Sequence, residues 1–306
     1  MDKESEKLIK NQMKNPNDFR KFKKLIGETK AYDIPKSFTG ELRPYQKIGY
    51  SWLVSNVRYK FGCILADDMG LGKTVQVLTA ILHFKEANPL DSEPSLIIVP
   101  PTLISNWENE IKKFTPELSY YIYHGSNRTF PFEEYDIMLT SYGVIRLDLD
   151  MFLDKTWFIC VIDEAQNIKN PNTQQTKAIK NIKAKTKIAL TGTPIENKLT
   201  DYWSIFDFVN KGYLSTLDNF KANYVMRIER LEETSTLEKF KTILLESYRR
   251  EYNEPQVVKS SSNDIKENDA GKLSVSITSK EQFQAIVQSD FIGKLKNIYI
   301  PHRLFG

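Results

Sequence analysis

Short, continuously apolar runs recur along this chain, and each ends in a cluster of Gly, Pro, Asp or Thr that leads into a helical pattern. Because hydrophobicity does not alternate within a run, the runs predict strands that are buried on both faces. Strands that alternate with helices predict an α/β fold, in which right-handed crossovers join a parallel sheet flanked by helices on both faces. The expected strands are Gly62–Ala66, Leu96–Val99, Ile137–Thr140, Phe158–Ile162 and Lys187–Leu190. The expected helices are Leu42–Leu53, Thr74–Ala87, Leu103–Phe114, Tyr142–Leu153 and Thr173–Ile182, with further aromatic-rich helices in residues 200–255.

Composition argues against a membrane-spanning, secreted or disulfide-rich protein. The 306 residues allow one large domain or two smaller ones, and 41% of them are hydrophobic, which is enough for a substantial core. The longest strongly apolar stretch, Leu96–Ile104, contains two prolines and falls short of the roughly 20 residues that a membrane span needs. The charged N-terminus does not resemble a signal peptide, and two cysteines cannot make a disulfide framework. We therefore expect an intracellular protein without a membrane partner.

Charge is distributed unevenly. Residues 1–30 form a basic tail or helix that carries the whole formal net charge of +4, so the remainder is neutral. Any nucleic-acid contact must therefore come from local patches. Residues 256–272 are polar and predict a flexible linker, and a strand-then-helix pattern follows it.

The segment Asp67–Thr74, DDMGLGKT, follows the first expected strand and opens the next helix. A glycine-rich turn before a helix lets backbone N–H groups point at phosphate oxygens, with help from the helix dipole. Lys73 would reach the β- and γ-phosphates, and the Thr74 hydroxyl would bind Mg²⁺. The expected nucleotide-binding residues are Asp68, Met69, Gly70, Leu71, Gly72, Lys73 and Thr74. The alternative is a tight strand–helix turn with a surface lysine.

Two carboxylates, Asp163 and Glu164, end the fourth expected strand. Carboxylates at the end of a buried strand are costly unless they bind a cation or do chemistry. Asp163 is placed to hold Mg²⁺, and Glu164 to orient and deprotonate an attacking water, although a chance acidic loop is the alternative.

Other strand ends carry weaker signals. Thr191, Gly192 and Thr193 follow the fifth strand and would sense the γ-phosphate, unless they form an ordinary turn. Gln46 would read adenine through its amide, and a surface helix is the alternative. The expected nucleic-acid contacts follow the second and third strands, and they are Thr102, Ser105, Trp107 and Tyr142. Core packing is the alternative for Trp107.

These motifs, in this order, resemble the first RecA-like lobe of the Swi/Snf-type DNA translocases, a branch of the superfamily-two helicase-like ATPases. The matching phrases are LRPYQKIGYSWL, ILADDMGLGKTVQ, LIIVPPTLISNWENEIKKF, YHGSNR, TSYGVI, VIDEAQNIKN, LTGTPIENKLTDYWSIFDFVN and FKANY. The resemblance implies a RecA-like P-loop domain, with ATP and Mg²⁺ as cofactors and double-stranded DNA as partner. It also implies DNA-dependent ATP hydrolysis that drives chromatin or nucleoprotein remodelling. Residues 31–255 would be lobe one with a helical extension, and 273–306 the start of a connection to a second lobe.

The sequence departs from the family pattern in three places. Gln166 stands where histidine is commonest, which would alter coupling to DNA, and Asp68 replaces the usual glutamate. The second RecA-like lobe is missing, including its arginine-bearing motif, so the chain would need that lobe in trans or in a full-length protein. We therefore expect weak activity from the isolated chain, in the bacterial cytoplasm rather than the nucleus. The alternative is a non-hydrolysing nucleotide- or DNA-binding module, as a truncated product or one subunit of a split translocase.

Overall fold

The computed structural model describes residues 31–88, 93–126, 128–129, 135–192, 198–231, 235–236, 240, 248–249, 265–267 and 273–275. These residues form a seven-stranded sheet in the order β3-β4-β2-β5-β6-β1-β7, in which every pairing is parallel. The strands are β1 (Cys63–Leu65), β2 (Ser95–Val99), β3 (Tyr120–Tyr123), β4 (Ile137–Ser141), β5 (Thr156–Ile162), β6 (Lys183–Leu190) and β7 (Tyr248–Arg249). A separate antiparallel pair joins β8 (Ile265–Glu267) to β9 (Leu273–Val275).

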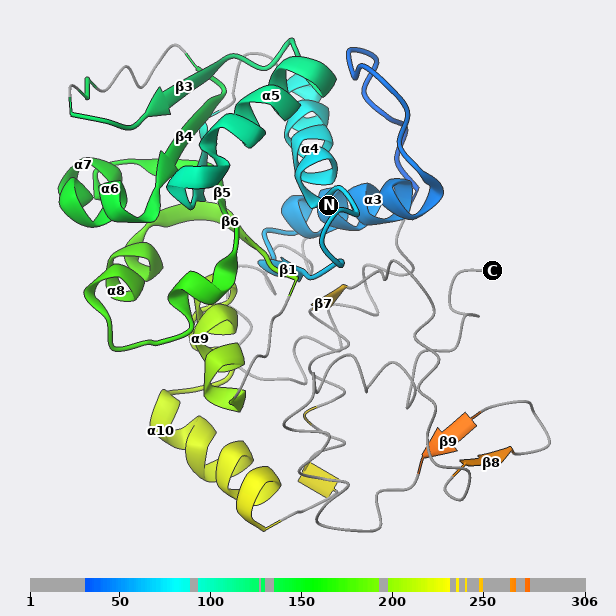
Figure 1. The fold of residues 1–306 in the computed structure, drawn as a ribbon, viewed down its shortest axis with the longest axis vertical. Coiled ribbons are helices and arrows are strands. Elements are labelled where there is room, and N and C mark those ends of the chain that lie inside the picture. The colour runs from blue at the N-terminus through cyan, green and yellow to red at the C-terminus, as the bar shows by residue number, and fades with distance from the viewer. Residues whose placement is uncertain are drawn as a thin grey trace, which may run out of the picture.

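Helices cover both faces of the sheet (Figure 1). On one face, alternate strand residues such as Leu65 and Val99 pack against α3 (Pro44–Arg58), α4 (Lys73–Ala87) and α5 (Ile104–Phe114). On the other face, the intervening residues pack against α6 (Tyr142–Leu147), α7 (Leu149–Leu153), α8 (Gln174–Asn181) and α9 (Leu199–Val209). The central strands are buried on both faces, which is why their sequences are continuously apolar. The α/β fold expected from the sequence is confirmed.

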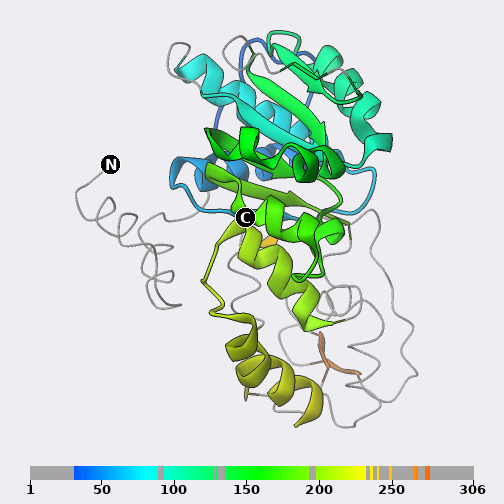
Figure 2. The same cartoon turned by 90° about the vertical axis from the view of Figure 1, so that its left-hand side faces the viewer.

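A helical extension leaves the sheet after α9. It comprises α10 (Leu217–Phe220) and the π-helical segment η3 (Lys221–Arg230), and Figure 2 shows it projecting away from the sheet. The Asn210 side chain ties the end of α9 to the start of β1, because it accepts from Gly62 N at 3.0 Å and donates to Gly62 O at 2.6 Å. Of the helices expected in residues 200–255, α9 and α10 are confirmed, and most of residues 237–255 lies outside the described residues. The expectation of a helix is wrong at Tyr248–Arg249, because these residues pair in parallel with Ile64 and Leu65 of β1 and form β7.

The five expected strands are all present, but three further strands, β3, β7 and β8, escaped sequence analysis. Tyr120–Tyr123 forms the edge strand β3, whose first three residues are only half-buried and therefore do not make an apolar run. The single helix expected over Tyr142–Leu153 is wrong: it breaks at Asp148 into α6 and α7. The Asp148 carboxylate instead accepts hydrogen bonds from Tyr123 Oη at 3.0 Å and Arg128 Nε at 2.7 Å.

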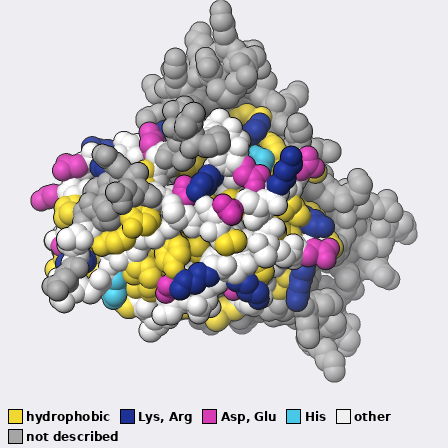
Figure 3. Space-filling view, turned by 90° about the horizontal axis from the view of Figure 1, so that it is seen from above, with side chains coloured by type: hydrophobic (Ala, Val, Ile, Leu, Met, Phe, Trp, Pro, Cys, Tyr) yellow, Lys and Arg dark blue, Asp and Glu magenta, His cyan; other side chains and the backbone are white. Residues whose placement is uncertain are grey.

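Segment 1–30 lies wholly outside the described residues, segments 256–272 and 273–306 lie largely outside them, and the roles expected for all three stay predictions. Within the expected linker, however, Ile265–Glu267 forms β8, and Leu273–Val275 forms β9 where a strand was expected. Within the described part of the chain, no helix combines the length and hydropathy that a membrane crossing requires. On the face shown in Figure 3, acidic and basic side chains are interspersed, as the neutral balance of residues 31–306 predicts.

Candidate nucleotide site

The carboxyl ends of β1, β5 and β6 bring the sequence motifs to one edge of the sheet. The register pairs Leu65 with Leu190 and Ile162 with Ala189, so the loops that follow these strands emerge side by side. Open parallel sheets bind their ligands beyond this edge. The phosphate-loop motif, the acidic pair and the Thr191 segment are therefore neighbours in space.

The loop between β1 and α4 depends on two glycines in the left-handed region. Gly70 has φ +81° and Gly72, which precedes the first turn of α4, has φ +76°. Other L-residues pay roughly 1–2 kcal/mol for this conformation. The turn brings Lys73 back over the loop, where its Nζ donates to the backbone oxygens of Asp67 at 2.7 Å and Asp68 at 3.2 Å. Thr74 follows in the first turn of α4, where it is half-buried.

Gln46 of α3 supports this loop from behind. Its Nε2 donates to Leu71 O at 3.1 Å, and its Oε1 accepts from Arg43 N at 2.9 Å. A Cβ atom on Gly72 would lie 2.5 Å from Gln46 Nε2, so the side chain and the loop are in close contact. Gln46 is thus buried at the loop rather than on a surface helix. Recognition of adenine by its amide stays a prediction.

Sequence reasoning missed a supporting residue, Gln76, in the second turn of α4. Its Nε2 donates to Asp67 Oδ2 at 3.0 Å, and both side chains are fully buried. An isolated buried carboxylate is expensive, so this amide stabilises the first residue of the loop. The only sign of this contact in the sequence is that Asp67 and Gln76 are polar and lie nine residues apart, on either side of a glycine turn. Such pairs are too common to predict a contact.

Asp163 ends β5 and is held on both carboxylate oxygens. Its Oδ2 accepts from Trp107 Nε1 at 2.8 Å, and its Oδ1 accepts from Glu164 N at 2.8 Å. Tyr142 Oη donates to the backbone oxygen of Asp163 at 2.7 Å. Burial raises the pKa of the Asp163 carboxyl, while the Trp107 hydrogen bond acts in the opposite direction. Each carboxylate oxygen has a second lone pair, so the group can also accept a cation.

Glu164 adopts φ +52° and begins a chain of side-chain hydrogen bonds between β5 and β6. Gln166 Nε2 donates to Glu164 Oε2 at 2.6 Å, and Thr191 Oγ1 donates to Gln166 Oε1 at 3.1 Å. Gly192 lies beside Met69 of the phosphate loop, since a Cβ on Gly192 would be 3.4 Å from Met69 Cγ. Thr193 lies outside the described residues.

The Asp163 carboxylate acts electrostatically on the Lys73 ammonium. Burial lowers the pKa of the Lys73 ammonium, and the Asp163 carboxylate is the strongest of the nearby charges that raise it again. An ammonium and a carboxylate at one edge, beside a hydroxyl on a helix N-terminus, make the donor set that a Mg²⁺–polyphosphate needs. The residues present therefore fit the expected cofactor, with Thr74 and Asp163 as the candidate metal ligands.

The expected nucleic-acid contacts divide into two groups. Thr102 and Ser105 are exposed, and they stay predicted DNA contacts. Trp107 is fully buried, Tyr142 is 4% exposed, and both side chains donate to Asp163. In this structure the two side chains therefore face Asp163 from inside the protein, as the alternative of core packing predicts for Trp107, and direct contact of either with DNA stays a prediction.

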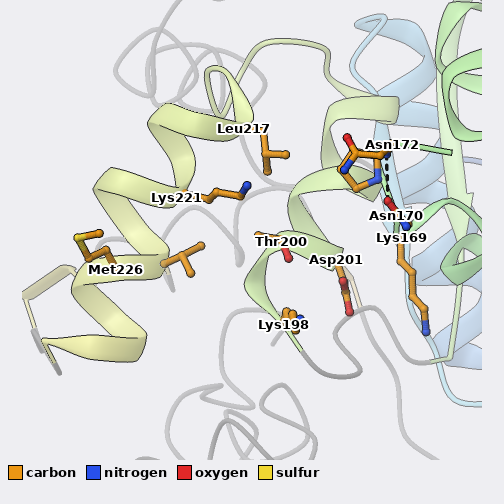
Figure 4. Close-up of a pocket in the computed structure, with 11 residues that line it drawn as sticks. Lys169, Asn170, Asn172, Lys198, Thr200, Asp201, Leu217, Lys221 and Met226 are labelled. Atoms are coloured by element: carbon orange, nitrogen blue, oxygen red, sulfur yellow. Dashed lines mark hydrogen bonds between the residues drawn. The ribbon is translucent and has the colours of Figure 1, made fainter.

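A groove of about 700 Å³ lies apart from this site, between the start of α9 and the helical extension (Figure 4). Lys169, Lys198 and Lys221 line it together with Asp201 and the apolar side chains of Leu217, Val225 and Met226. None of the phosphate-loop residues or the acidic pair lines this groove.

Comparison with known proteins identifies the family of this chain. The family model described as SNF2-related domain matches residues 45–285. The chain belongs to the SNF2-related domain family. The match spans the phosphate loop, the acidic pair and α9, so the resemblance seen in the motifs and the RecA-like fold are confirmed.

Proteins of similar sequence come from bacteria and eukaryotes. The Bacillus subtilis protein YwqA, named as an ATP-dependent helicase/translocase, is 45% identical over 205 residues, 65% of this chain and 22% of its own length. The Mycoplasma genitalium helicase MG018 is 41% identical over 207 residues, 66% of this chain and 19% of its own length. The TATA-binding protein-associated factor mot1 of Schizosaccharomyces pombe is 32% identical over 241 residues, 74% of this chain and 12% of its own length.

A solved structure, the Sulfolobus solfataricus SWI2/SNF2 ATPase core in complex with double-stranded DNA, matches with a TM-score of 0.68. The sequences are 41% identical, and the match covers 73% of this chain and 47% of that core. The chain thus spans less than a quarter of these curated relatives and about half of the solved SNF2 core.

Proposed function

We propose that this chain is the ATP-binding first lobe of a Swi/Snf-type translocase, which hydrolyses ATP in response to double-stranded DNA. The observation that carries the proposal is that Lys73 and the Asp163–Glu164 pair follow β1 and β5 at the same edge of the sheet. A lysine on a glycine turn can bind phosphate, and an adjacent carboxylate pair adds the groups that turnover requires. Membership of the SNF2-related family supports the choice of ATP as the nucleotide.

Each residue has a distinct role in this proposal. The loop amides and Lys73 bind the β- and γ-phosphates, and Thr74 and Asp163 hold Mg²⁺. Bound Mg²⁺ would neutralise charge on the phosphate oxygens. Glu164 accepts the proton of the water that attacks the γ-phosphorus as the bond to the bridging oxygen breaks. Gln166 holds Glu164 in place and, with Thr191 and Gly192, links it to β6 and the phosphate loop.

The proposed translocase needs two partners for this lobe, double-stranded DNA and a second RecA-like lobe. The DNA complex of the solved SNF2 core supports DNA as a partner, with Thr102 and Ser105 as exposed candidates for phosphate contact. The second lobe would come from a full-length protein or in trans, and remodelling of DNA-bound protein would need both lobes. Its arginine would accelerate hydrolysis by a factor on the order of 10³–10⁵, by analogy with arginine fingers. Bacterial relatives support the bacterial cytoplasm as the place of action.

A second candidate function is nucleotide or DNA binding without turnover. The glycine turn at Gly70 and Gly72 would be sufficient for such binding, because its backbone N–H groups can hold phosphate without any hydrolysis. The hydrogen bond that fixes Glu164 favours the first candidate, because a binding module has no use for a positioned base.

The test compares ATP hydrolysis with and without duplex DNA, before and after adding a second lobe, alongside nucleotide-binding titrations. We expect Lys73→Ala to lose nucleotide binding, and Glu164→Gln to keep binding while losing turnover by at least about 100-fold. Lys185→Ala and Glu93→Gln are matched controls, because this half-exposed ion pair lies near the starts of β6 and β2, away from the site. Unchanged turnover in Glu164→Gln would refute its role, and binding without DNA-stimulated turnover would select the second candidate.

A further inference from the structure

The groove between the start of α9 and the helical extension carries a local excess of positive charge. Lys169, Lys198 and Lys221 line it, against the single carboxylate of Asp201 among its described lining residues. Lys198 and Lys221 are exposed, and neither forms an ion pair within the described part of the chain. Because residues 31–306 are neutral as a whole, this excess distinguishes the groove from the rest of the surface and favours an anionic ligand.

The helical extension gives the same groove an apolar side. Leu217 of α10 and Val225 of η3 are half-buried, because they also pack against the core on the α9 face of the sheet. Met226 is 48% exposed, and its flexible thioether can adapt to the side chains of a partner. Apolar surface contributes to binding only where the ligand also brings apolar groups, so the groove favours a ligand that is both anionic and apolar.

The winding of η3 brings charged and apolar groups to the same side of the extension. Its residues form a π-helix, a rare conformation that is frequent at functional sites. In such a helix, residues four and five positions apart lie on one side, and Lys221, Val225 and Met226 accordingly all line the groove. Figure 4 shows Lys221 extending from η3 toward Thr200 and Asp201 at the start of α9. A ligand in the groove would therefore contact a lysine and apolar side chains together.

Two features favour a peptide over a nucleic acid as this ligand. The Asp201 carboxylate lines the same groove as the lysines and would repel a phosphate backbone. The apolar side chains of the extension gain little from sugar and phosphate, whereas a peptide can place aliphatic or aromatic groups against them and carboxylates against the lysines. The volume of about 700 Å³ lies in the usual range for ligand pockets and fits a few side chains of a short segment.

We propose that this groove binds a short acidic peptide segment of a partner protein. Carboxylates of the segment face Lys198 and Lys221, and an apolar side chain of the segment lies against Val225 and Met226. The basic residues 1–30 of this chain do not suit the groove, because their net charge of +4 has the same sign as that of the lysines. Peptide binding here requires neither a nucleotide nor a second lobe, so the inference does not rest on the proposed function.

A peptide library tests this proposal on the whole chain. Short random peptides displayed on phage are selected on the immobilised chain, and the enriched peptides are synthesised and titrated by fluorescence anisotropy. We expect them to combine acidic and apolar residues, and Lys221→Glu to weaken their binding about tenfold, because attraction is replaced by repulsion. Met226→Gln keeps the length of the side chain but removes its apolar character, and should weaken binding about threefold. Lys113→Glu is the matched control, because Lys113 is an exposed lysine of α5 that does not line the groove.

The proposal is overturned if no peptide is enriched, if the enriched peptides lack acidic residues, or if Lys221→Glu and Lys113→Glu bind them equally. A loss in Lys221→Glu with none in Met226→Gln would mean that the groove recognises charge alone, as a nucleic-acid site does, and would also overturn it. Both groove variants should keep the nucleotide affinity and the denaturant unfolding of the unaltered chain, which verifies that they fold. Loss of nucleotide binding by the unaltered chain would overturn the proposed function and leave this inference standing.

Discussion

The phosphate loop (residues 67–74) and the acidic loop (residues 163–168) lie at the same edge of the sheet but are held in different ways. The phosphate loop is shaped mainly by its own backbone, through the left-handed Gly70 and Gly72 and the short-range bonds of Lys73. The acidic loop is held by side chains distant in sequence. Trp107 is 56 residues from its partner Asp163, and Thr191 is 25 residues from Gln166.

Because the two loops are held differently, we expect changes in them to affect different measurable properties. Backbone N–H groups bind phosphate whether or not a metal is present. Substitutions in the phosphate loop should therefore weaken nucleotide binding both with and without Mg²⁺. A carboxylate positioned by side chains acts through a cation, so damage there should appear only in Mg²⁺ dependence and turnover.

The largest effect is expected from Gly72→Ala. The new Cβ adds a left-handed penalty of roughly 1–2 kcal/mol and would lie 2.5 Å from Gln46 Nε2, which displaces the loop support. We expect nucleotide affinity to fall about 100-fold, with and without Mg²⁺, in titrations with a fluorescent analogue.

Gly70→Ala is the matched control for this variant. Gly70 has φ +81° but open space around its Cβ position, so the alanine pays only the backbone penalty. Equal losses in the two variants would show that the Gln46 contact does not support the loop.

An intermediate effect is expected from Gln76→Leu. The change removes the amide donor to the fully buried Asp67 carboxylate, so we expect the free energy of unfolding to fall by about 1–3 kcal/mol. Denaturant titration measures this loss. Gln175→Leu provides the control, because its amide bonds to Asn167 O at the surface, and a similar loss there would contradict the argument.

The smallest effect is expected from Thr191→Val, which keeps the side-chain shape but removes the donor to Gln166 Oε1. Nucleotide affinity should be unchanged, while DNA-stimulated hydrolysis with a second lobe present should fall a few-fold, on the order of one neutral hydrogen bond. A loss of nucleotide affinity without a loss of turnover would reverse the assignment of this residue to the acidic loop.

The phosphate loop could be predicted because its chemistry is local. Glycine spacing, a lysine and a hydroxyl within eight residues specify the turn, and the apolar run before it specifies the strand. The role of Trp107 could not be predicted, because an indole in an amphipathic helix packs in a core whether or not its N–H meets a carboxylate. The break at Asp148 was hidden for a similar reason, since it depends on Tyr123 and Arg128 from a different part of the chain.

The parallel α/β sheet and the residues at its carboxyl edge follow from local patterns, because hydrophobic runs and glycine turns depend on a few neighbouring residues. The contacts of Trp107 and Tyr142 with Asp163, and of Gln46 with the phosphate loop, depend instead on how distant elements pack together. Strand order and helix packing bring these groups within hydrogen-bond distance, and such long-range placement is not encoded in any local pattern.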